Sequence, residues 1–363
     1  MIILIPPNYQ KGFEGFLRCA YNNGDKIITT SPRLDFIENI NSISWKLVLH
    51  KFDRAALWMP SIYKLYRTIK ASDTKEVHLV GEPTYLSNIS IYFAFVLNRI
   101  TPSWTCRVAQ NLAFPMPIIF WACIYLFRRK NNLAFPVSKI SKNLAENHYG
   151  INKTQVLPNG VPEAFYLTPF KTNKRYRVTF IGNFYSRKGI DDFLKISNQF
   201  KNNKKIKFTA IGGDVETIAQ LSKTYSHVDF VKKIERERLI DYLDQSIALL
   251  VCSKKTINND LKGIKKLISV PWAEQFGRVI IESYSRGTNV IAYDSGAISE
   301  VVIDKQFLSA EGDINKMKNT LHKYIKSLKY TDQEFVATLV NYSKQFKWNL
   351  IYKRFLEIRN GFY

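Results

Sequence analysis

Short apolar runs alternate with helix-length segments along almost the whole chain, and this alternation constrains the fold more than any other feature. In the first half the runs typical of strands are Ile2–Ile5, Ile27–Thr29, Ala56–Met59, Val77–Val80 and Cys106–Ala109. In the second half they are Val178–Ile181, Lys207–Ile211, Val228–Val231, Ile247–Cys252 and Asn289–Tyr293. The helix-length segments include Thr84–Leu97, Ile190–Gln199, Glu216–Lys223, Arg278–Arg286 and Ile314–Lys326. This spacing predicts βαβ units, and therefore parallel sheets covered by helices on both faces.

The pattern is interrupted by a polar, proline-containing stretch, Glu163 to Lys174, and restarts near Tyr176. A chain of 363 residues is long enough for two domains of ordinary size. We therefore predict an α/β protein with two Rossmann-like domains, of which residues 1–165 form the first.

The charge of the chain restricts its partners. Lys and Arg number 53 against 30 Asp and Glu, which gives a formal net charge of +23. Both halves are basic, and such a charge suits nucleic acid, an anionic membrane surface or phosphorylated small molecules. The sequence has no helix-turn-helix, zinc-finger or RNA-recognition signature. We therefore favour a membrane surface and a phosphate-bearing ligand, and leave a basic nucleic-acid-binding protein as a weak alternative.

The start of the sequence and its cysteines are those expected of a cytoplasmic protein. The chain begins MIILIPP, without a basic n-region or a full apolar h-region, so no signal peptide is expected. The four cysteines are scattered, with neither a CxxC pair nor metal-ligand spacing, as is common for unpaired thiols in a reducing compartment.

The most apolar stretch, Pro117–Phe127, is followed at once by Arg128, Arg129 and Lys130. Because about 20 residues are needed to span a bilayer, this stretch is too short to cross one. Two interpretations remain: a buried helix, or an interfacial helix whose aromatic face enters lipid beside a cationic cluster. We expect the protein to be cytoplasmic and peripheral on the inner face of the cell membrane.

Ligands of open parallel sheets bind at the carboxyl ends of the strands, where loops lead into helices. The strand Val178–Ile181 is followed by the loop GNFYSRKG, Gly182–Gly189. We expect Gly182 to permit a tight turn, and Arg187 and Lys188 stand beside a helix N-terminus that already favours anions. The loop is a candidate diphosphate site, with a solvated basic surface as the alternative. Strand ends at Gly212–Asp214 and Phe230–Lys233 are candidate nucleoside contacts, with a plain turn as the alternative for the first.

The run PWAEQFGRVIIE, Pro271 to Glu282, places two glutamates with seven residues between them. Glu274 lies in a loop beside Gly277, and Glu282 falls in the opening turns of a helix. Glycine there admits a close ligand and exposes amide donors at a positive helix end, and the carboxylates can accept from the hydroxyls of a sugar and a ribose. For an isolated glutamate, a favourable position in the helix dipole would be the preferred explanation of Glu282, and only the whole arrangement favours a binding role.

These blocks together resemble glycosyltransferase family 4, a large family of retaining enzymes with the GT-B fold. Gly182–Gly189 resembles its phosphate loop, and Glu274, Phe276, Gly277 and Glu282 match its paired-glutamate block. Weaker likenesses lie at Arg286–Val290, Ser295–Glu300, Gly81–Pro83, Ala109–Asn111 and Pro158–Val161. The end of the chain, Phe346–Glu357, is similar to the family's final helix, which crosses back onto the first domain. The resemblance implies a donor domain over residues 166–343, a crossing helix in 344–363 and an acceptor-binding first domain.

The resemblance also implies roles for single residues. Lys188 would bind the donor's phosphates, with Arg187 supplying a charge that the family usually has at Asn183. Glu282 would hold the ribose, and Glu274 would contact the transferred sugar and the leaving diphosphate. The implied catalytic residues are Glu274, Lys188 and Arg187, and the implied donor-binding residues are Gly182, Asn183, Lys188, Gly212, Val231, Phe276, Gly277, Arg278 and Glu282. The implied acceptor-binding residues are Gly12, Phe13, Glu82, Gln110 and Asn111.

The sequence departs from the family pattern in three places. The acceptor-side loop Lys11–Gly15 is a weak match, and a histidine that often faces the donor sugar is replaced around Gln110 and Asn111. Ser253–Ser269 reads as a lysine-rich insertion, which we interpret as a solvated loop or, alternatively, a contact to anionic lipid or acceptor.

The expected activity is retaining transfer of a sugar from a nucleotide-diphosphate sugar, with UDP or GDP, to a glycan or lipid-linked acceptor. Lipopolysaccharide or capsule synthesis in bacteria is the expected setting. No metal or cofactor is expected, because the five histidines lack ligand spacing and no Asp-x-Asp lies in a suitable loop. Asp191 and Asp192 are interpreted as capping and surface residues.

Other enzyme classes remain as alternatives. An epimerase or phosphorylase of the same fold stays open. A nicotinamide dehydrogenase is disfavoured, because Pro6-Pro7-Asn8 stands where a Gly-x-Gly-x-x-Gly motif would follow the first strand.

Overall fold

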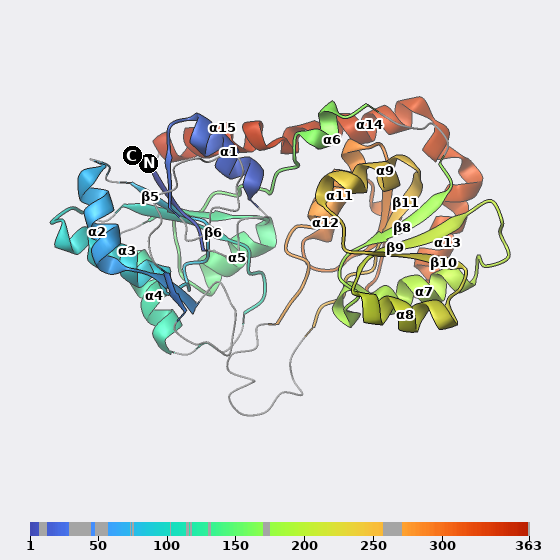
Figure 1. Cartoon of the computed structure of the whole chain (residues 1–363), viewed down its shortest axis with the longest axis horizontal. Coiled ribbons are helices and arrows are strands. Elements are labelled where there is room, and N and C mark those ends of the chain that lie inside the picture. The colour runs from blue at the N-terminus through green and yellow to red at the C-terminus, as the bar shows by residue number, and fades with distance from the viewer. Residues whose placement is uncertain are drawn as a thin grey trace. The chain divides into compact units, whose positions relative to one another are not determined.

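The computed structural model describes residues 1–6, 13–28, 57–72, 74, 76–101, 103–113, 116, 118–129, 132–169, 175–256 and 271–361, and the backbone of 45–47. It divides into two compact units, each built around its own parallel sheet (Figure 1). The first unit contains Met1–Gly160, Pro271 and Trp348–Tyr363, and the second contains Val161–Ile257 and Trp272–Lys347. The predicted α/β fold with two Rossmann-like domains is confirmed.

The sheet of the first unit has five parallel strands in the order β2-β1-β5-β6-β7. They are β1 (Ile2–Leu4), β2 (Lys26–Ile28), β5 (Val77–Leu79), β6 (Trp104–Val108) and β7 (Ala134–Pro136). The helices are α1 (Glu14–Asn22), α2 (Ile62–Ala71), α3 (Ser87–Leu97), α4 (Ile118–Arg129), α5 (Lys139–Asn147) and α15 (Trp348–Asn360). Every residue of β1, β5, β6 and β7 is buried, as expected for parallel strands covered on both faces.

The strand predicted at Ala56–Met59 does not join this sheet. Its described part forms β4 (Trp58–Pro60), which pairs antiparallel with β3 (Trp45–Leu47). Trp58 and Met59 are only half-buried, whereas central parallel strands are buried on both faces. The sheet position is taken instead by β7, an edge strand that includes Pro136, and a proline within an apolar run argues against a strand.

Two helical layers cover the first sheet. Apolar side chains of α2, α3 and α4 share one hydrophobic cluster with β5 and β6, while α1 and α15 belong to another cluster. The C-terminal helix therefore packs on the first unit although the second unit precedes it in sequence, and Figure 1 shows α15 in red beside α1 in blue. The ring of Trp348 lies so close to Gly15 and Gly160 that a Cβ would be 2.0 Å and 2.3 Å from its carbons. The returning helix implied by the resemblance is confirmed.

The sheet of the second unit has six parallel strands in the order β10-β9-β8-β11-β12-β13. They are β8 (Arg177–Ile181), β9 (Lys207–Gly213), β10 (Val228–Lys232), β11 (Ser246–Val251), β12 (Asn289–Tyr293) and β13 (Leu308–Ser309). The helices are α6 (Ala164–Leu167), α7 (Ile190–Asn198), α8 (Val215–Thr224), α9 (Leu239–Asp244), α11 (Arg278–Ser285), α12 (Ile298–Val301), α13 (Ile314–Ser327) and α14 (Gln333–Ser343). Single 3₁₀ turns are η3 (Ser186–Lys188), η4 (Arg236–Arg238), η5 (Lys305–Phe307), η6 (Lys329–Thr331) and η7 (Lys344–Phe346).

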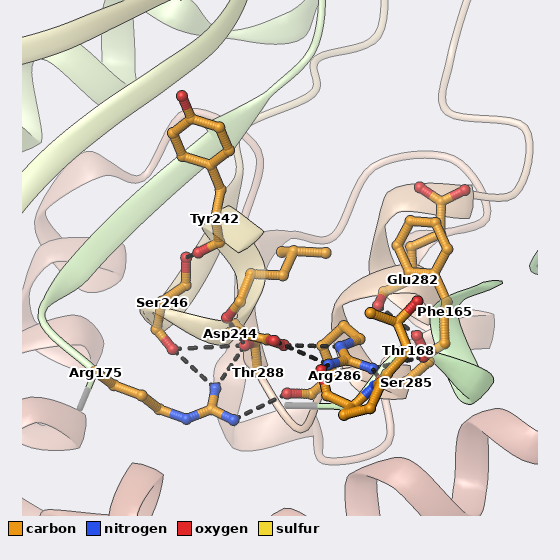
Figure 2. Close-up of polar contacts among 12 residues, drawn as sticks. Phe165, Thr168, Arg175, Tyr242, Asp244, Ser246, Glu282, Ser285, Arg286 and Thr288 are labelled. Carbon is orange, nitrogen blue, oxygen red and sulfur yellow. Dashed lines mark hydrogen bonds and ion pairs between the residues drawn. The ribbon is translucent and has the colours of Figure 1, made fainter. Parts of the chain in front are cut away.

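A buried ion pair connects the ends of α9 and α11 in the second unit (Figure 2). The guanidinium of Arg286, at the end of α11, contacts both carboxylate oxygens of Asp244 at the end of α9, at 2.7 Å and 2.8 Å. The same guanidinium donates to the carbonyls of Phe165 and Thr168 at 3.0 Å and 2.8 Å. Because both charges are buried, each depends on the other for compensation.

A second arginine continues this network (Figure 2). Arg175, just before β8, donates to the carbonyls of Ser246 and Arg286, each at 2.9 Å, and to Oγ1 of Thr288 at 2.6 Å. The contacts join the start of β8 to the starts of β11 and β12.

Candidate functional site

The topological switch point of the second sheet lies between β8 and β11. The chain moves from β8 to β9 and β10 on one side, then returns to β11, β12 and β13 on the other. Open α/β sheets bind ligands at this point, beyond the carboxyl ends of the strands. The loops after the two strands meet there, since the amide of Lys254 donates to the carbonyl of Arg187 at 2.8 Å.

The loop after β8 is shaped by Gly189, not by Gly182. Gly189 has a φ of 74°, and a Cβ there would lie 2.0 Å from the carbonyl oxygen of Cys252, so only glycine fits. Gly182 has no left-handed φ, and a Cβ there would meet nothing closer than 3.7 Å. The backbone bends at Gly182, but this bend does not require glycine, because a Cβ there would be in ordinary van der Waals contact with Phe180 and Lys188.

The structure brings the predicted residues Lys188 and Glu274 together. Nζ of Lys188 donates to Oε2 of Glu274 at 2.7 Å, and Oγ of Ser253 donates to the same oxygen at 3.0 Å. Lys188 lies two residues before α7, whose N-terminal amides favour negative charge. A diphosphate, with more charge than one carboxylate, would compete with Glu274 for this ammonium group.

Trp272 contacts both cations of the loop, and sequence reasoning missed it. Cζ of Arg187 lies 4.6 Å and Nζ of Lys188 lies 4.4 Å from the centroid of its ring. Such distances are those of cation–π interactions. Trp272 is held in turn by paired backbone hydrogen bonds with Thr256, of 2.8 Å and 3.1 Å. The available signal was an aromatic residue two positions before Glu274.

Replacing Trp272 with leucine is expected to weaken binding of UDP about tenfold, because two cation–π contacts that hold Arg187 and Lys188 are lost. Titration calorimetry on Trp272→Leu and Trp272→Phe measures this, and the phenylalanine variant should keep most of the affinity. Thermal unfolding of both variants serves as the control for folding. A Trp272→Leu protein with wild-type affinity would refute the positioning role of the indole.

Glu282 is almost completely buried, with 1% of its side chain exposed. The guanidinium of Arg236, from η4, forms an ion pair with Oε1 at 3.1 Å, but within the described part of the chain neither carboxylate oxygen accepts a hydrogen bond. Burial raises the pKa of Glu282, and Arg236 opposes that rise. Glu282 is the fifth residue of α11, outside its first turn, so the helix-dipole alternative does not explain it. A buried carboxylate with unfilled acceptor capacity suits a ligand that brings hydroxyl donors.

The N-terminus of α11 supplies backbone donors. Gly277 caps this helix with a φ of 78°, and a Cβ there would lie 2.7 Å from Cδ1 of Ile280, so the position requires glycine. Phe276 is buried against Phe346, with ring centroids 5.8 Å apart, and its side chain anchors the loop. Contacts from Phe276, Gly277 and the partly buried Arg278 to a ligand would therefore include the backbone amides of this turn.

The remaining predicted donor residues also lie at the carboxyl edge of this sheet. Asn183 is exposed in the loop after β8, Gly212 is near the end of β9, and Val231 is near the end of β10. A Cβ at Gly212 would lie 2.4 Å from the carbonyl oxygen of Gly182, so the ends of β8 and β9 are in close contact.

The surface interpretation of Asp192 is wrong, while Asp191 is exposed as expected. The Asp192 carboxylate is buried and accepts from the hydroxyl of Tyr293 at 2.9 Å and from Nζ of Lys254 at 2.8 Å. Because the amide of Lys254 holds Arg187, Asp192 anchors the loop from within the core.

The predicted acceptor residues lie in the first unit. Glu82 follows β5, and its Oε1 accepts from the amides of Ala109 and Gln110 at 2.7 Å and 2.9 Å. Its Oε2 has no hydrogen-bond partner among the described residues, and burial raises the pKa of Glu82 to about 7. Asn111 is buried.

Of the remaining predicted acceptor residues, the structure describes Phe13 but not Gly12. Phe13 is buried, with Cζ of Arg107 at 5.2 Å from its ring centroid. Gly12 and residues 257–269 of the lysine-rich insertion lie outside the described residues. Within the described ranges, no group of three His, Cys, Asp or Glu side chains is arranged to hold a metal ion.

Residues 168–345 match the model of a family described as Glycosyl transferases group 1. The match covers just under half of the chain and most of the second unit. Among curated proteins, none matches this chain.

Solved structures resemble the chain over its whole length. HepE from Anabaena, solved in complex with UDP, is 14% identical, with 99% of each chain covered and a TM-score of 0.72. A glycosyltransferase from Rickettsia africae is 18% identical, with 98% of this chain and 97% of that chain covered and a TM-score of 0.74. Sucrose-phosphate synthase from Thermosynechococcus elongatus is 16% identical, with 99% and 98% covered and a TM-score of 0.70. At these identities the likeness establishes the fold, which is that of GT-B glycosyltransferases.

Proposed function

We propose that the chain is a retaining glycosyltransferase of family 4 that takes a sugar from a nucleotide-diphosphate sugar, with UDP as the favoured nucleotide. The acceptor is a glycan or a lipid-linked glycan in the synthesis of a bacterial surface polysaccharide. The second unit, which contains most of the donor domain predicted over residues 166–343, binds the donor, and the first unit binds the acceptor. The choice of UDP is supported by the similarity to HepE, which was solved with UDP.

The observation that carries the proposal is the pairing of two features of the second unit: the Lys188–Glu274 ion pair beyond β8, and the buried carboxylate of Glu282 near the start of α11. Lys188 and Arg187 offer two cations beside the start of α7, and Glu282 offers a buried carboxylate with free acceptor capacity. A nucleoside diphosphate has the complementary chemistry, with anionic phosphates and two ribose hydroxyls.

In the proposed mechanism these residues act by electrostatics. As the bond to the sugar breaks, negative charge develops on the leaving diphosphate. Lys188, Arg187 and the first amides of α11 would stabilise that charge, which lowers the barrier. Glu274, already held by Lys188 and Ser253, would contact the transferred sugar. The acceptor hydroxyl would approach from the face that the diphosphate leaves and give its proton to the departing phosphate oxygen, so the anomeric configuration is retained.

The stereochemistry of transfer tests the proposal. The protein is incubated with a UDP-α-sugar and a lipid-linked or soluble glycan acceptor, and the anomeric proton of the new bond is followed by NMR. We expect an α-linked product. A β-linked product would contradict the retaining mechanism, and release of an epimerised nucleotide sugar without transfer would favour the epimerase alternative.

A further inference from the structure

Exposed apolar side chains gather on one helical layer of the first unit. α3 packs against α2 on one side and against α4 on the other. We call the outward side chains of two of these helices the α3–α4 face: Phe93, Val96 and Leu97 of α3, and Ile118, Ile119 and Tyr125 of α4. Ile118 is 87% exposed and Tyr125 is 60% exposed. Clusters of this kind on a protein surface mark a contact with another apolar phase.

The inner sides of the same helices already fill the core. Phe95 of α3 and Phe127 of α4 are fully buried in the cluster that covers β5 and β6. α3 therefore has apolar side chains on both its inner and its outer side, and the core does not account for the outer ones. A helix that is apolar all round is typical of a buried or membrane-facing position.

The charged side chains of α2, α3 and α4 are all basic. α2, α3 and α4 contain no Asp or Glu, while α2 carries Lys64, Arg67 and Lys70 and α4 ends in Arg128 and Arg129. All five basic residues are exposed. Apolar side chains flanked by long cationic ones are the pattern of surfaces that lie in the interface of an anionic bilayer. The methylene stems of Lys and Arg can lie along the apolar region while their charges reach the headgroups.

A second copy of this chain fits the face less well. A symmetric dimer would place the same patch of both copies against itself, so basic residues would face basic residues with no acid from these helices to compensate. An anionic lipid surface removes that repulsion.

We propose that the α3–α4 face docks the protein on a bilayer rich in anionic phospholipid, with Ile118 and Tyr125 in the headgroup boundary and Arg128 and Arg129 at the phosphates. This inference rests on the proposed function, because a lipid-linked acceptor would be held in such a bilayer. Docking is peripheral: within the described ranges, no helix is both long enough and apolar enough to cross a membrane.

Vesicle sedimentation tests the proposal. The full chain is mixed at low salt with vesicles of phosphatidylcholine alone or of phosphatidylcholine with phosphatidylglycerol. We expect sedimentation with the anionic vesicles only. The Arg128→Gln/Arg129→Gln variant should bind them about thirtyfold more weakly, since each basic residue at such a surface contributes about a fivefold factor. Ile118→Ser/Tyr125→Ser should weaken binding at least about tenfold, with less recovery at low salt.

Matched controls come from the second unit. Lys316→Gln/Lys323→Gln removes the same charge from exposed positions of α13, and Val215→Ser removes an exposed apolar side chain from α8. Both controls should sediment like the wild type. Wild-type protein that stays in solution with anionic vesicles overturns the proposal, as do α4 variants that sediment no worse than their controls. A concentration-dependent dimer that the Ile118→Ser/Tyr125→Ser variant abolishes would assign the face to a second copy instead.

UDP titration of the same variants separates this inference from the proposed function. We expect unchanged UDP affinity in the α4 variants. Vesicle binding by a protein that binds no nucleotide would support the docking face and contradict the proposed transferase. Nucleotide binding without vesicle binding would support the proposed transferase and contradict the docking face.

Discussion

A Lys188→Ala protein is expected to transfer sugar about a hundredfold or more slowly than the wild type, because the proposed function assigns this fixed cation to the leaving diphosphate. Its affinity for UDP should fall about tenfold to a hundredfold, the range for a charge-assisted hydrogen bond to phosphate. Initial rates at saturating acceptor and calorimetric titration with UDP give the two numbers.

The matched control for this variant is Lys195→Ala. Lys195 is an exposed lysine in the last turn of α7, the helix that Lys188 precedes. Its removal changes the net charge equally and should leave both the rate and the affinity at wild-type values. If Lys195→Ala loses as much affinity as Lys188→Ala, the effect comes from overall charge, and the assignment of Lys188 to the phosphates is wrong.

An Asp244→Ala protein is expected to lose about 3–5 kcal/mol of stability, because the buried guanidinium of Arg286 is left without its counter-charge. For a domain of this size each kcal/mol lowers the Tm by about 2–4 °C, so the second unit should unfold well before the first. Differential scanning calorimetry would resolve the early transition. The carbonyls of Phe165 and Thr168 still contact Arg286, but they do not neutralise it.

Two comparisons check this interpretation. Arg18→Ala removes an exposed pair with Glu14 and should leave the Tm unchanged, since exposed ion pairs contribute little. The double variant Asp244→Leu/Arg286→Met removes both charges at once and should be more stable than Asp244→Ala. A double variant less stable than the single one would show that the hydrogen bonds of Arg286 to the backbone, and not its charge, hold the unit together.

Much of the fold is predictable from this sequence because parallel strands are buried on both faces. Val178–Ile181 and Asn289–Tyr293 are apolar runs bounded by polar or glycine-containing segments, and both are central strands. β13, with two residues, is too short to carry such a signal, and β7 is obscured because Pro136 argues against a strand, although this strand lies at the edge of its sheet. The run at Ala56–Met59 was misplaced because an apolar run alone does not distinguish a central strand from a half-buried hairpin.

Site residues are predictable where a charged side chain comes directly after a strand. They are less predictable where their contacts depend on how loops pack on one another. Lys188 and Glu274 are 86 residues apart, yet the switch-point rule and the family resemblance both point to them, and they form an ion pair. The contacts of Trp272, Arg236 and Asp192 depend on how segments that follow different strands pack against one another. No local pattern encodes this, and Asp192 at a helix start is indistinguishable in sequence from an exposed cap.

The central claim is that the carboxyl edge of the second sheet binds a nucleoside diphosphate. Calorimetric titration of the full chain with UDP, GDP, ADP and CMP, in the presence of EDTA, tests it most directly. The account predicts selective binding of UDP that survives the chelator, is weakened about tenfold to a hundredfold in Lys188→Ala and is also weakened in Glu282→Ala. A correctly folded protein that binds none of the four nucleotides, or a Glu282→Ala protein with wild-type affinity for UDP, would contradict it.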